Sequence, residues 1–245
     1  RTRREPPGSL GAIAAGVIGL VTGLPVMLLF LVTAVPLWVS VPLAAIDVAL
    51  LAAFLRLEGT PLASVALLAG LAATSLVATW MSQAFARTPS IKDASGRPAA
   101  GSIASLERVE LNGSQQWITI RGKDRDKPVL LYLGIGGPGA GGFPASAMTL
   151  KPLEDHFVVV NWDQPGTGKS YGAAPIPTLT VEHFVSDAHE LTQLLRERFH
   201  QDKIYVMGLS WGTILGTKLV HQYPGLYHAY IGTGQMVNTT ENDRL

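Results

Sequence analysis

A long stretch near the N-terminus carries almost no charge, and it limits what the chain can fold into more than any other feature. Between Leu10 and Ala86 the only charged residues are Asp47, Arg56 and Glu58. A bilayer core of roughly 30 Å needs about 20 consecutive apolar residues in a helix, so this stretch is long enough for several spans. A cleaved signal peptide would have a much shorter apolar region. The sequence therefore predicts a membrane region over residues 1–87.

Two interruptions divide the apolar stretch into three predicted helices. A turn is expected near Thr33–Pro36, because proline disfavours helix in the residue before it. A short polar break follows at residues 56–61. About three transmembrane helices are therefore predicted, at Ala12–Val32, Leu37–Leu55 and Leu62–Ala84.

The distribution of arginine predicts the orientation of these spans. Arg1, Arg3 and Arg4 precede the first span, and Arg56 lies between the second and the third. Since Lys and Arg are enriched in cytoplasmic loops, both segments are placed in the cytoplasm. With three spans, everything after the third lies outside. The sequence predicts a multi-pass protein of the cell membrane whose remaining residues are extracytoplasmic, with the lipid bilayer as a partner.

Asp47 is the one ionisable residue inside a predicted span. Such residues are functional candidates by default. No Lys, Arg or His lies at membrane depth to pair with it, so we interpret Asp47 as a packing or partner-contact residue rather than part of a transport path.

The composition excludes several classes of function. Lys and Arg number 19 against 18 Asp and Glu, so no basic surface for nucleic acid is indicated. The chain has no cysteine, which excludes disulfides, thiolate metal sites and cysteine nucleophiles. Residues 88–101, with Pro89, Gly96 and Pro98, are typical of an exposed linker.

Residues 102–245 show strands alternating with helices. Asn112-Gly113 between two alternating segments predicts a β-hairpin. A helix is predicted at Val181–Phe199, where apolar residues recur at steps of three and four, with Thr180 as its N-cap. Further strands are predicted at Pro128–Ile135, Phe157–Trp162, Lys203–Leu209 and Tyr227–Gly232, with a second helix ending before Pro224. Helices between buried strands indicate an α/β fold with a mostly parallel sheet.

The strongest chemical motif is Gly208-Leu209-Ser210-Trp211-Gly212, which matches G-x-S-x-G between a predicted strand and a predicted helix. In that context the serine sits on a sharp turn that holds its oxygen clear of the sheet at a helix N-terminus. We therefore predict Ser210 as a catalytic nucleophile. The alternative is a glycine-rich turn that only allows close packing.

A second motif, Gly136-Gly137-Pro138-Gly139, follows the strand Pro128–Ile135 directly. Glycines at a strand end let backbone N–H groups approach a ligand. We predict an oxyanion hole made by the backbone N–H groups of Gly137 and Trp211. Gly136, Pro138 and Gly139 support this loop.

A third segment looks like a phosphate-binding loop but departs from that pattern. It runs from Asp163 to Ser170 with the sequence DQPGTGKS, and Asp163 stands where G-x-x-x-x-G-K-[ST] needs glycine. Gly172, Pro175 and Pro177 follow, so no helix can start at once to hold a phosphate. We therefore predict no nucleotide site here, and treat Asp163, Gly166 and Gly168 as residues that support the active site.

The three motifs, in this order and spacing, resemble the α/β-hydrolase superfamily, and most closely its proline iminopeptidase branch, serine peptidase family S33. That branch typically shows HGGPG, DQRGxGxS and GxSWG. The resemblance covers about residues 102–245 and departs from the branch at Ile135, in place of its His, and at Pro165, in place of its Arg. It implies an α/β-hydrolase fold, acyl transfer through Ser210, and removal of N-terminal residues from peptides.

The acid and base of a catalytic triad are missing from the expected places. In this fold the order is Ser, then Asp or Glu, then His. After Ser210 the only such residues are His221, His228, Glu241 and Asp243, and none stands where a triad member belongs. The upstream histidines (His156, His183, His189 and His200) are interpreted as ordinary surface or core-edge residues. His183 and His189 fall on different helix faces, so no metal site is predicted with Asp187, and no cofactor is predicted.

The simplest interpretation is that these residues are the N-terminal portion of a longer enzyme, with the hydrolase domain incomplete at its C-terminus. Two alternatives stay open. One is an esterase or lipase of the same fold, acting on ester rather than peptide substrates. The other is a catalytically inactive hydrolase fold that serves as a membrane-tethered binding module.

Overall fold

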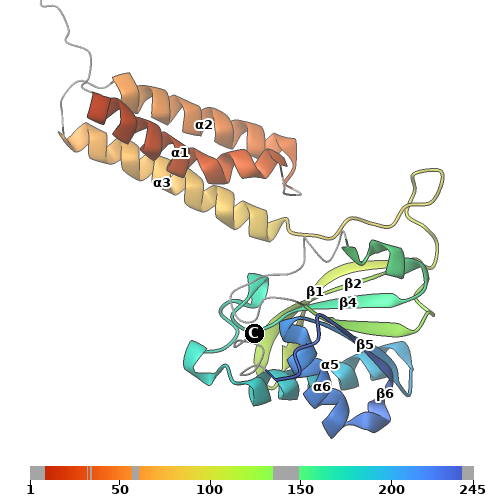
Figure 1. Cartoon of the computed structure of the whole chain (residues 1–245). Coiled ribbons are helices and arrows are strands. Elements are labelled where there is room, and N and C mark those ends of the chain that lie inside the picture. Colours follow the sequence, from red (N-terminus) through yellow and green to blue (C-terminus); the bar gives the residue numbers. More distant parts are fainter. Residues whose placement is uncertain (1–8, 32, 34, 57–60, 135–148, 239–245) are drawn as a thin grey trace, which may run out of the picture. The chain divides into compact units, whose positions relative to one another are not determined.

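The computed structural model describes residues 9–31, 33, 35–56, 61–134 and 149–238. By internal contacts the chain falls into two compact units, Arg1–Arg87 and Thr88–Leu245. The first is helical and the second is built on a β-sheet (Figure 1).

The first unit contains three helices at the predicted positions: α1 at Ser9–Leu31, α2 at Leu37–Arg56 and α3 at Pro61–Ala84. Helix α2 begins directly after Pro36, at the predicted turn, whereas Pro25 and Pro42 lie inside α1 and α2. Within the described residues, two segments are long and apolar enough to cross a membrane, Leu37–Phe54 and Leu62–Ala84. The apolar part described in α1 is shorter, Val17–Leu31, so the count of three spans stays a prediction.

Small and polar side chains hold the three helices together. Asp47 in α2 is 5% exposed and accepts a hydrogen bond from the Thr74 hydroxyl of α3, with 2.7 Å between the oxygens. The Ser75 hydroxyl of α3 donates to the backbone carbonyl of Thr22 in α1. A Cβ on Gly23 would lie 3.5 Å from the Asp47 carboxylate. Asp47 therefore makes a contact between helices, which agrees with its interpretation as a packing residue.

The second unit is a six-stranded sheet in the order β1-β2-β4-β3-β5-β6. Its strands are β1 Ile103–Leu111, β2 Ser114–Gly122, β3 Val129–Leu133, β4 Val158–Asp163, β5 Ile204–Leu209 and β6 Tyr227–Thr233. Strands β4, β3, β5 and β6 run parallel, whereas β1 and β2 form an antiparallel hairpin at one edge. Asn112 and Gly113 both have positive φ in the hairpin turn, which confirms the prediction from that dipeptide.

Two helices cover one face of this sheet, α5 at Val181–Phe199 and α6 at Trp211–Gln222. Helix α5 has the predicted bounds, and the Thr180 side chain accepts a hydrogen bond from the His183 backbone N–H as its N-cap. The main core lies between these helices and the sheet and includes Ile118, Leu131, Val160, Phe184, Leu191 and Val206. The carboxyl ends of the parallel strands lie on the same side of the sheet, and the loops that lead to α5 and α6 begin there.

Residues 88–101 depart from a free linker. Most of their side chains are exposed, but Ile91 is buried and Lys92 pairs with Pro98 in an isolated bridge. The Arg121 side chain donates hydrogen bonds to the Thr88 hydroxyl and to the Pro89 carbonyl. The Arg121 guanidinium has several N–H donors, and oxygens of Thr88 and Pro89 accept from them. These contacts make the segment part of the second unit.

Candidate active site

Ser210 lies on the turn between β5 and α6, in a conformation that side chains rarely adopt. Its φ is 54° and its ψ is −116°, and its side chain is exposed. A non-glycine residue in a sparsely populated backbone region costs of order 1–3 kcal/mol and persists only where the surroundings impose it. The structure therefore places Ser210 as the sequence motif predicts, with its catalytic role still a prediction.

The two flanking glycines let the turn approach neighbouring backbone. A Cβ on Gly208 would lie 2.5 Å from the Gly212 carbonyl oxygen, and a Cβ on Gly212 would collide with the carbonyl of Leu133 at the end of β3. Both positions therefore require glycine. At Gly208 the requirement comes from the close approach of β5 to the start of α6, and at Gly212 from the packing of α6 against the end of β3.

Hydrogen bonds fix this turn at both ends. The Ser210 backbone N–H donates to the Thr233 carbonyl at the end of β6, at 3.0 Å. The Ser210 carbonyl accepts from the backbone N–H of Thr213, at 2.8 Å, and from its hydroxyl, at 2.6 Å. Trp211 is the first residue of α6, and the first N–H groups of a helix have no partner inside the helix. Its N–H thus has no partner inside the helix, and its role as an oxyanion donor stays a prediction.

The Trp211 side chain connects the turn to the end of β4. Its indole N–H donates to the Gln164 side-chain oxygen at 3.1 Å, and its ring meets the Phe184 ring edge-to-face with 5.9 Å between centroids. The Asp-Gln pair is a family feature in the sequence, and nothing local to it predicts this contact. Proximity of two motifs at the carboxyl edge of one sheet is the signal that would have indicated it.

Asp163 organises the loop after β4 from inside. It is 3% exposed, and its carboxylate accepts a hydrogen bond from the Lys169 backbone N–H at 2.8 Å. Burial raises the pKa of Asp163 to about 6, against the lowering effects of that hydrogen bond and of the nearby Lys169 charge. Gly168 has φ of 44°, and any Cβ there would collide with the Asp163 carboxylate. Asp163 and Gly168 therefore shape the loop that follows β4, in which Gly166 also has a positive φ, 81°.

The same loop does not have the form of a phosphate-binding loop. After Asp163 the chain makes two three-residue 3-10 turns, Gly168–Ser170 and Ile176–Thr178, and the next α-helix begins at Val181. The prediction that no helix follows the GTGKS string at once is confirmed. The backbone N–H of Lys169 points to a protein carboxylate, and the Ser170 hydroxyl accepts from the Trp117 backbone N–H at 2.8 Å.

The predicted oxyanion loop, Gly136, Gly137, Pro138 and Gly139, lies outside the described residues. Its starting point is nevertheless known. Strand β3 ends at Leu133, which pairs in register with Gly208 of β5, and Gly212 packs against the carbonyl of Leu133. The chain that leaves β3 therefore starts beside the Ser210 turn, which is where a donor loop for Ser210 is needed.

The described residues after Ser210 provide no base next to it. His221 lies in the last turn of α6, about 15 Å along the helix from its start at 1.5 Å per residue. His228 lies near the start of β6, at the opposite end of the strand from Thr233, which bonds Ser210. Glu241 and Asp243 lie outside the described residues. The predicted lack of a triad role for His221 and His228 therefore agrees with their positions.

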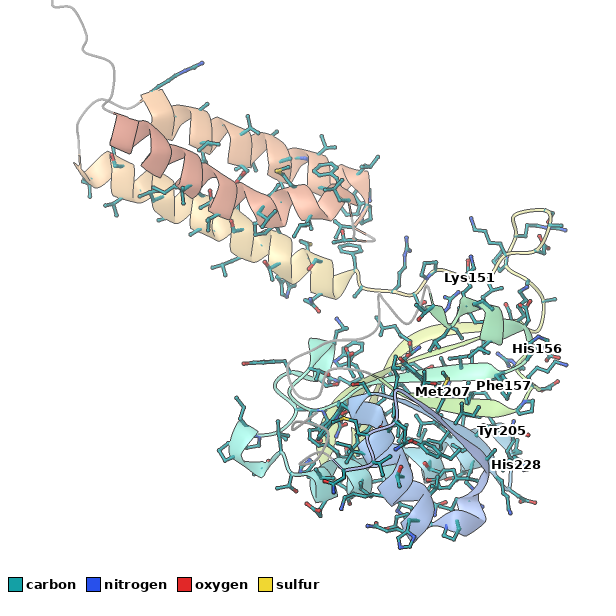
Figure 2. All side chains as sticks on the ribbon, viewed as in Figure 1. Lys151, His156, Phe157, Tyr205, Met207 and His228 are labelled. Carbon is teal, nitrogen blue, oxygen red and sulfur yellow. The ribbon has the colours of Figure 1, made fainter. Side chains whose placement is uncertain are left out.

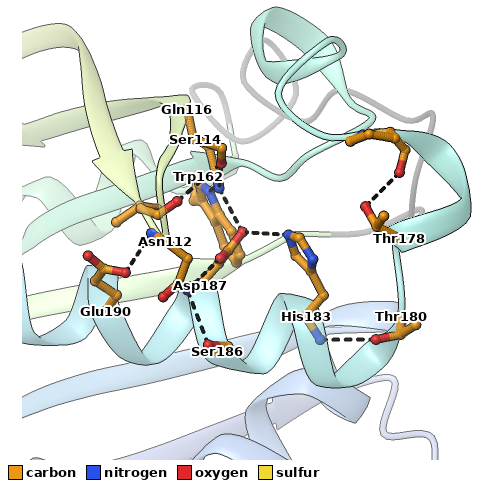
Figure 3. A network of polar contacts seen from close by, with 12 residues as sticks. Asn112, Ser114, Gln116, Trp162, Thr178, Thr180, His183, Ser186, Asp187 and Glu190 are labelled. Atoms are coloured by element: carbon orange, nitrogen blue, oxygen red, sulfur yellow. Dashed lines mark hydrogen bonds and ion pairs between the residues drawn. The ribbon is translucent and has the colours of Figure 1, made fainter.

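A buried polar network joins the β-hairpin to α5 (Figure 3). Asp187 is 1% exposed and accepts from the side-chain amides of Asn112, at 2.7 Å, and Gln116, at 2.6 Å. His183 Nε2 lies 3.3 Å from the same carboxylate. These partners satisfy Asp187, so the network holds the hairpin turn on the helix. Within the part of the chain that the structure describes, no three His, Asp or Glu side chains could hold a metal ion.

Comparisons with known proteins find that part of this unit is similar to proteins named as hydrolases. Residues 150–243 match the model of the family described as "Serine aminopeptidase, S33". The "Probable aminopeptidase YbaC" of Bacillus subtilis is 36% identical over 147 residues, which are 60% of this chain and 46% of that protein. A "Probable proline iminopeptidase" of Streptomyces coelicolor is 30% identical, over 46% of this chain and 34% of that protein.

Among solved structures, the proline iminopeptidase-related protein of Thermus thermophilus is similar at a TM-score of 0.46 and 22% identity, over 56% of this chain and 46% of that one. The chain spans less than half the length of these relatives. The sequence matches support a hydrolase of the α/β-hydrolase type.

Proposed function

We propose that this chain carries the nucleophile half of a membrane-anchored serine hydrolase that removes N-terminal residues from peptides. The observation that carries the proposal is the Ser210 turn, with its strained backbone, its two obligatory glycines and its place at the start of α6. The match to serine aminopeptidases and to proteins named as aminopeptidase and proline iminopeptidase supports the substrate class.

The proposed reaction is acyl transfer. The Ser210 hydroxyl oxygen attacks the carbonyl carbon of the substrate, and the carbonyl oxygen becomes an oxyanion. Backbone N–H groups of Trp211 and Gly137 bind this oxyanion, which stabilises the transition state in a water-poor site. The oxyanion collapses, the C–N bond breaks, and the amine leaves with the proton that the general base took from Ser210. Water then attacks the acyl-serine and gives up a proton to the base; the bond to the serine oxygen breaks, and Ser210 recovers its proton as the acyl product leaves as an acid. A serine needs a general base to lose its proton, and we assign that role to no described residue.

The membrane part of the proposal rests on the two long apolar helices. Helices α2 and α3 contain the segments Leu37–Phe54 and Leu62–Ala84, and α1 adds a third apolar helix. In the proposal all three cross the cell membrane, and the bias of Arg1, Arg3, Arg4 and Arg56 keeps the N-terminus in the cytoplasm. The hydrolase unit then faces the extracytoplasmic side.

Fluorophosphonate labelling of native membranes tests the enzymatic part. Labelling that disappears in Ser210→Ala supports a serine hydrolase, and release of N-terminal residues from peptides against hydrolysis of simple esters then separates an aminopeptidase from an esterase. Absence of labelling in the intact membrane protein, together with no turnover of either substrate class, contradicts the proposal. That result would favour a binding module, the alternative that the distance of His221 and His228 from the Ser210 turn supports.

A further inference from the structure

A cavity of about 950 Å³ lies in the second unit, beside the segment that enters it from α3. We name this segment, Thr88–Lys92, the juxtamembrane segment. The cavity is lined by it, by Arg121 and Lys123 at the end of β2, and by Lys151–Asp155. Figure 2 shows Lys151, which begins the short 3-10 helix Lys151–Asp155. None of the residues of the Ser210 turn lines this cavity.

The cavity has an excess of positive charge. Four cationic side chains, Lys92, Arg121, Lys123 and Lys151, face two carboxylates. Arg121 Nε lies 2.7 Å from Glu154 Oε1, and Lys123 Nζ lies 2.6 Å from Asp155 Oδ1, so each carboxylate already has a cation. Lys92 and Lys151 are exposed and have no ion pair among the residues described. Two positive charges are thus left to attract an anion.

The wall around these charges is partly apolar and firmly held. Ile91 is 8% exposed, and Pro89 and Pro152 complete the apolar lining. Arg121, which pairs with the buried Glu154, donates to the Thr88 hydroxyl of the juxtamembrane segment, at 2.7 Å from Arg121 Nη1. A site with cations beside apolar surface fits an anion that carries an apolar portion. Phospholipid headgroups have this character, and a surface of anionic lipid attracts Lys and Arg side chains that lie close to it.

The length of the chain keeps this site within reach of a membrane. Helix α3 ends at Ala84, and the cavity wall begins at Thr88. Four residues span at most about 14 Å, since an extended chain covers at most about 3.6 Å per residue. This step rests on the proposed membrane anchoring through α3. If α3 is embedded in the membrane, Thr88 lies within about 14 Å of its last residue, Ala84.

We propose that the juxtamembrane cavity binds the phosphate headgroup of an anionic phospholipid, with Lys92 and Lys151 as its charge partners. Arg121 acts as a positioning residue that holds the cavity wall. The bound lipid stabilises the second unit against the membrane surface and so adds a lipid-specific contact to the helical anchor.

Native mass spectrometry of the full chain in detergent tests the proposal, with phosphatidylglycerol and phosphatidylcholine of identical acyl chains as probes. Wild type is expected to retain phosphatidylglycerol in preference to phosphatidylcholine. Since each basic residue near an anionic surface contributes about a fivefold change in affinity, Lys92→Gln with Lys151→Gln is expected to weaken retention of phosphatidylglycerol about 30-fold. The matched control Lys127→Gln with Lys203→Gln removes two exposed lysines outside the cavity and leaves retention unchanged.

Three results overturn the proposal. The first is that wild type retains the two lipids equally. The second is that the two double variants retain phosphatidylglycerol equally. The third is that millimolar inorganic phosphate displaces the lipid and also binds tightly when no lipid is present. The last would assign the cavity to a soluble phosphate. Ser210→Ala is measured in parallel and is expected to retain lipid like wild type. Lipid retention without fluorophosphonate labelling would therefore refute the proposed enzyme and leave the lipid site standing. Labelling without lipid preference would refute the lipid site and leave the proposed enzyme standing.

Discussion

The indole N–H of Trp211 donates a hydrogen bond to the side-chain oxygen of Gln164, 47 residues earlier in the chain. One residue follows the proposed nucleophile, and the other follows Asp163 at the end of β4. The backbone N–H of Trp211 is a proposed oxyanion donor, so the side chain that holds this residue also affects where that donor points. Two motifs that look independent in the sequence therefore act as one structural unit.

Removal of the Gln164 acceptor should lower the reactivity of Ser210. Gln164→Leu leaves the indole N–H without this partner. A typical net hydrogen-bond contribution predicts that fluorophosphonate then reacts with Ser210 about 2- to 10-fold more slowly. The rate of labelling in membranes measures the effect. Gln115→Leu removes an exposed amide on β2 and serves as the control. Equal rates in wild type and Gln164→Leu would show that the contact does not position Trp211.

A methyl group on Gly212 should disrupt the turn, whereas one on Gly225 should be tolerated. The Gly212 Cβ would collide with the Leu133 carbonyl, and nothing lies within 4 Å of the Gly225 Cβ. Because backbone cannot move as a flexible side chain can, Gly212→Ala is expected to lose labelling and to lower the unfolding temperature by several degrees. Thermal unfolding followed by circular dichroism in detergent measures this, and similar curves for the two variants would contradict the argument.

Local patterns predicted the elements of this fold well because each signal acts over a few residues. Asn112-Gly113 predicts the hairpin turn through its positive φ angles, and the Thr180 cap with apolar residues at helical spacing predicts the bounds of α5. The G-x-S-x-G pattern likewise predicted the position of Ser210 at a strand–helix turn.

Contacts between distant residues were not predictable in the same way. The Trp211–Gln164 bond and the clamp of Arg121 on Thr88 join residues that only the completed sheet brings together. Residues 88–101 have the composition of a linker, and composition gives no sign that Arg121 on β2 bonds Thr88 and Pro89. Sequence separation, rather than weak patterning, explains what was missed.

Asp163 should make the second unit less stable as the pH rises through about 6. Burial raises the pKa of Asp163 to about 6 in the folded chain, against about 3.9 for an unfolded aspartate. The folded state therefore binds the proton more tightly. The stability from this group is fully present below pH 4 and is lost as the pH rises through 6.

Asp163→Asn removes this dependence. Relative to wild type, the variant is expected to gain stability between pH 4 and pH 8, by at most about 3 kcal/mol, since each pKa unit is worth about 1.36 kcal/mol. Unfolding curves in detergent at four pH values give the difference. Asp126→Asn, an exposed aspartate, is the control and should show no such trend. A constant offset between Asp163→Asn and wild type at all pH values would refute the raised pKa.

The hydrogen bond between Thr74 and Asp47 should stabilise the helical unit. Its oxygens are 2.7 Å apart, and both residues are buried between α2 and α3. Hydrogen bonds between membrane helices contribute about 0.6 kcal/mol on average and at most about 1.7. Thr74→Val should therefore lower the free energy of unfolding of the helices in detergent by about 0.6 kcal/mol, and by at most about 1.7 kcal/mol. Thr79→Val changes an exposed threonine of the same helix and should have a smaller effect.

Loss of the Arg121 clamp should expose the juxtamembrane segment to protease. Arg121 bonds Thr88, Pro89 and the buried carboxylate of Glu154. In Arg121→Leu the segment loses these bonds, and trypsin is expected to cleave after Lys92 about tenfold faster, because cleavage follows the population of locally open chain. Arg125→Leu, an exposed arginine nearby, is the control.

An unpaired Glu154 can also destabilise the whole unit, since loss of one partner leaves a buried charge uncompensated. Thr88→Val separates the two effects, because it removes one bond of the clamp and leaves the Arg121–Glu154 pair intact. This variant should show an intermediate rate of cleavage after Lys92, with an unchanged unfolding temperature. If Thr88→Val cleaves like wild type while Arg121→Leu unfolds as a whole, then Arg121 stabilises the sheet through Glu154 and does not hold the segment.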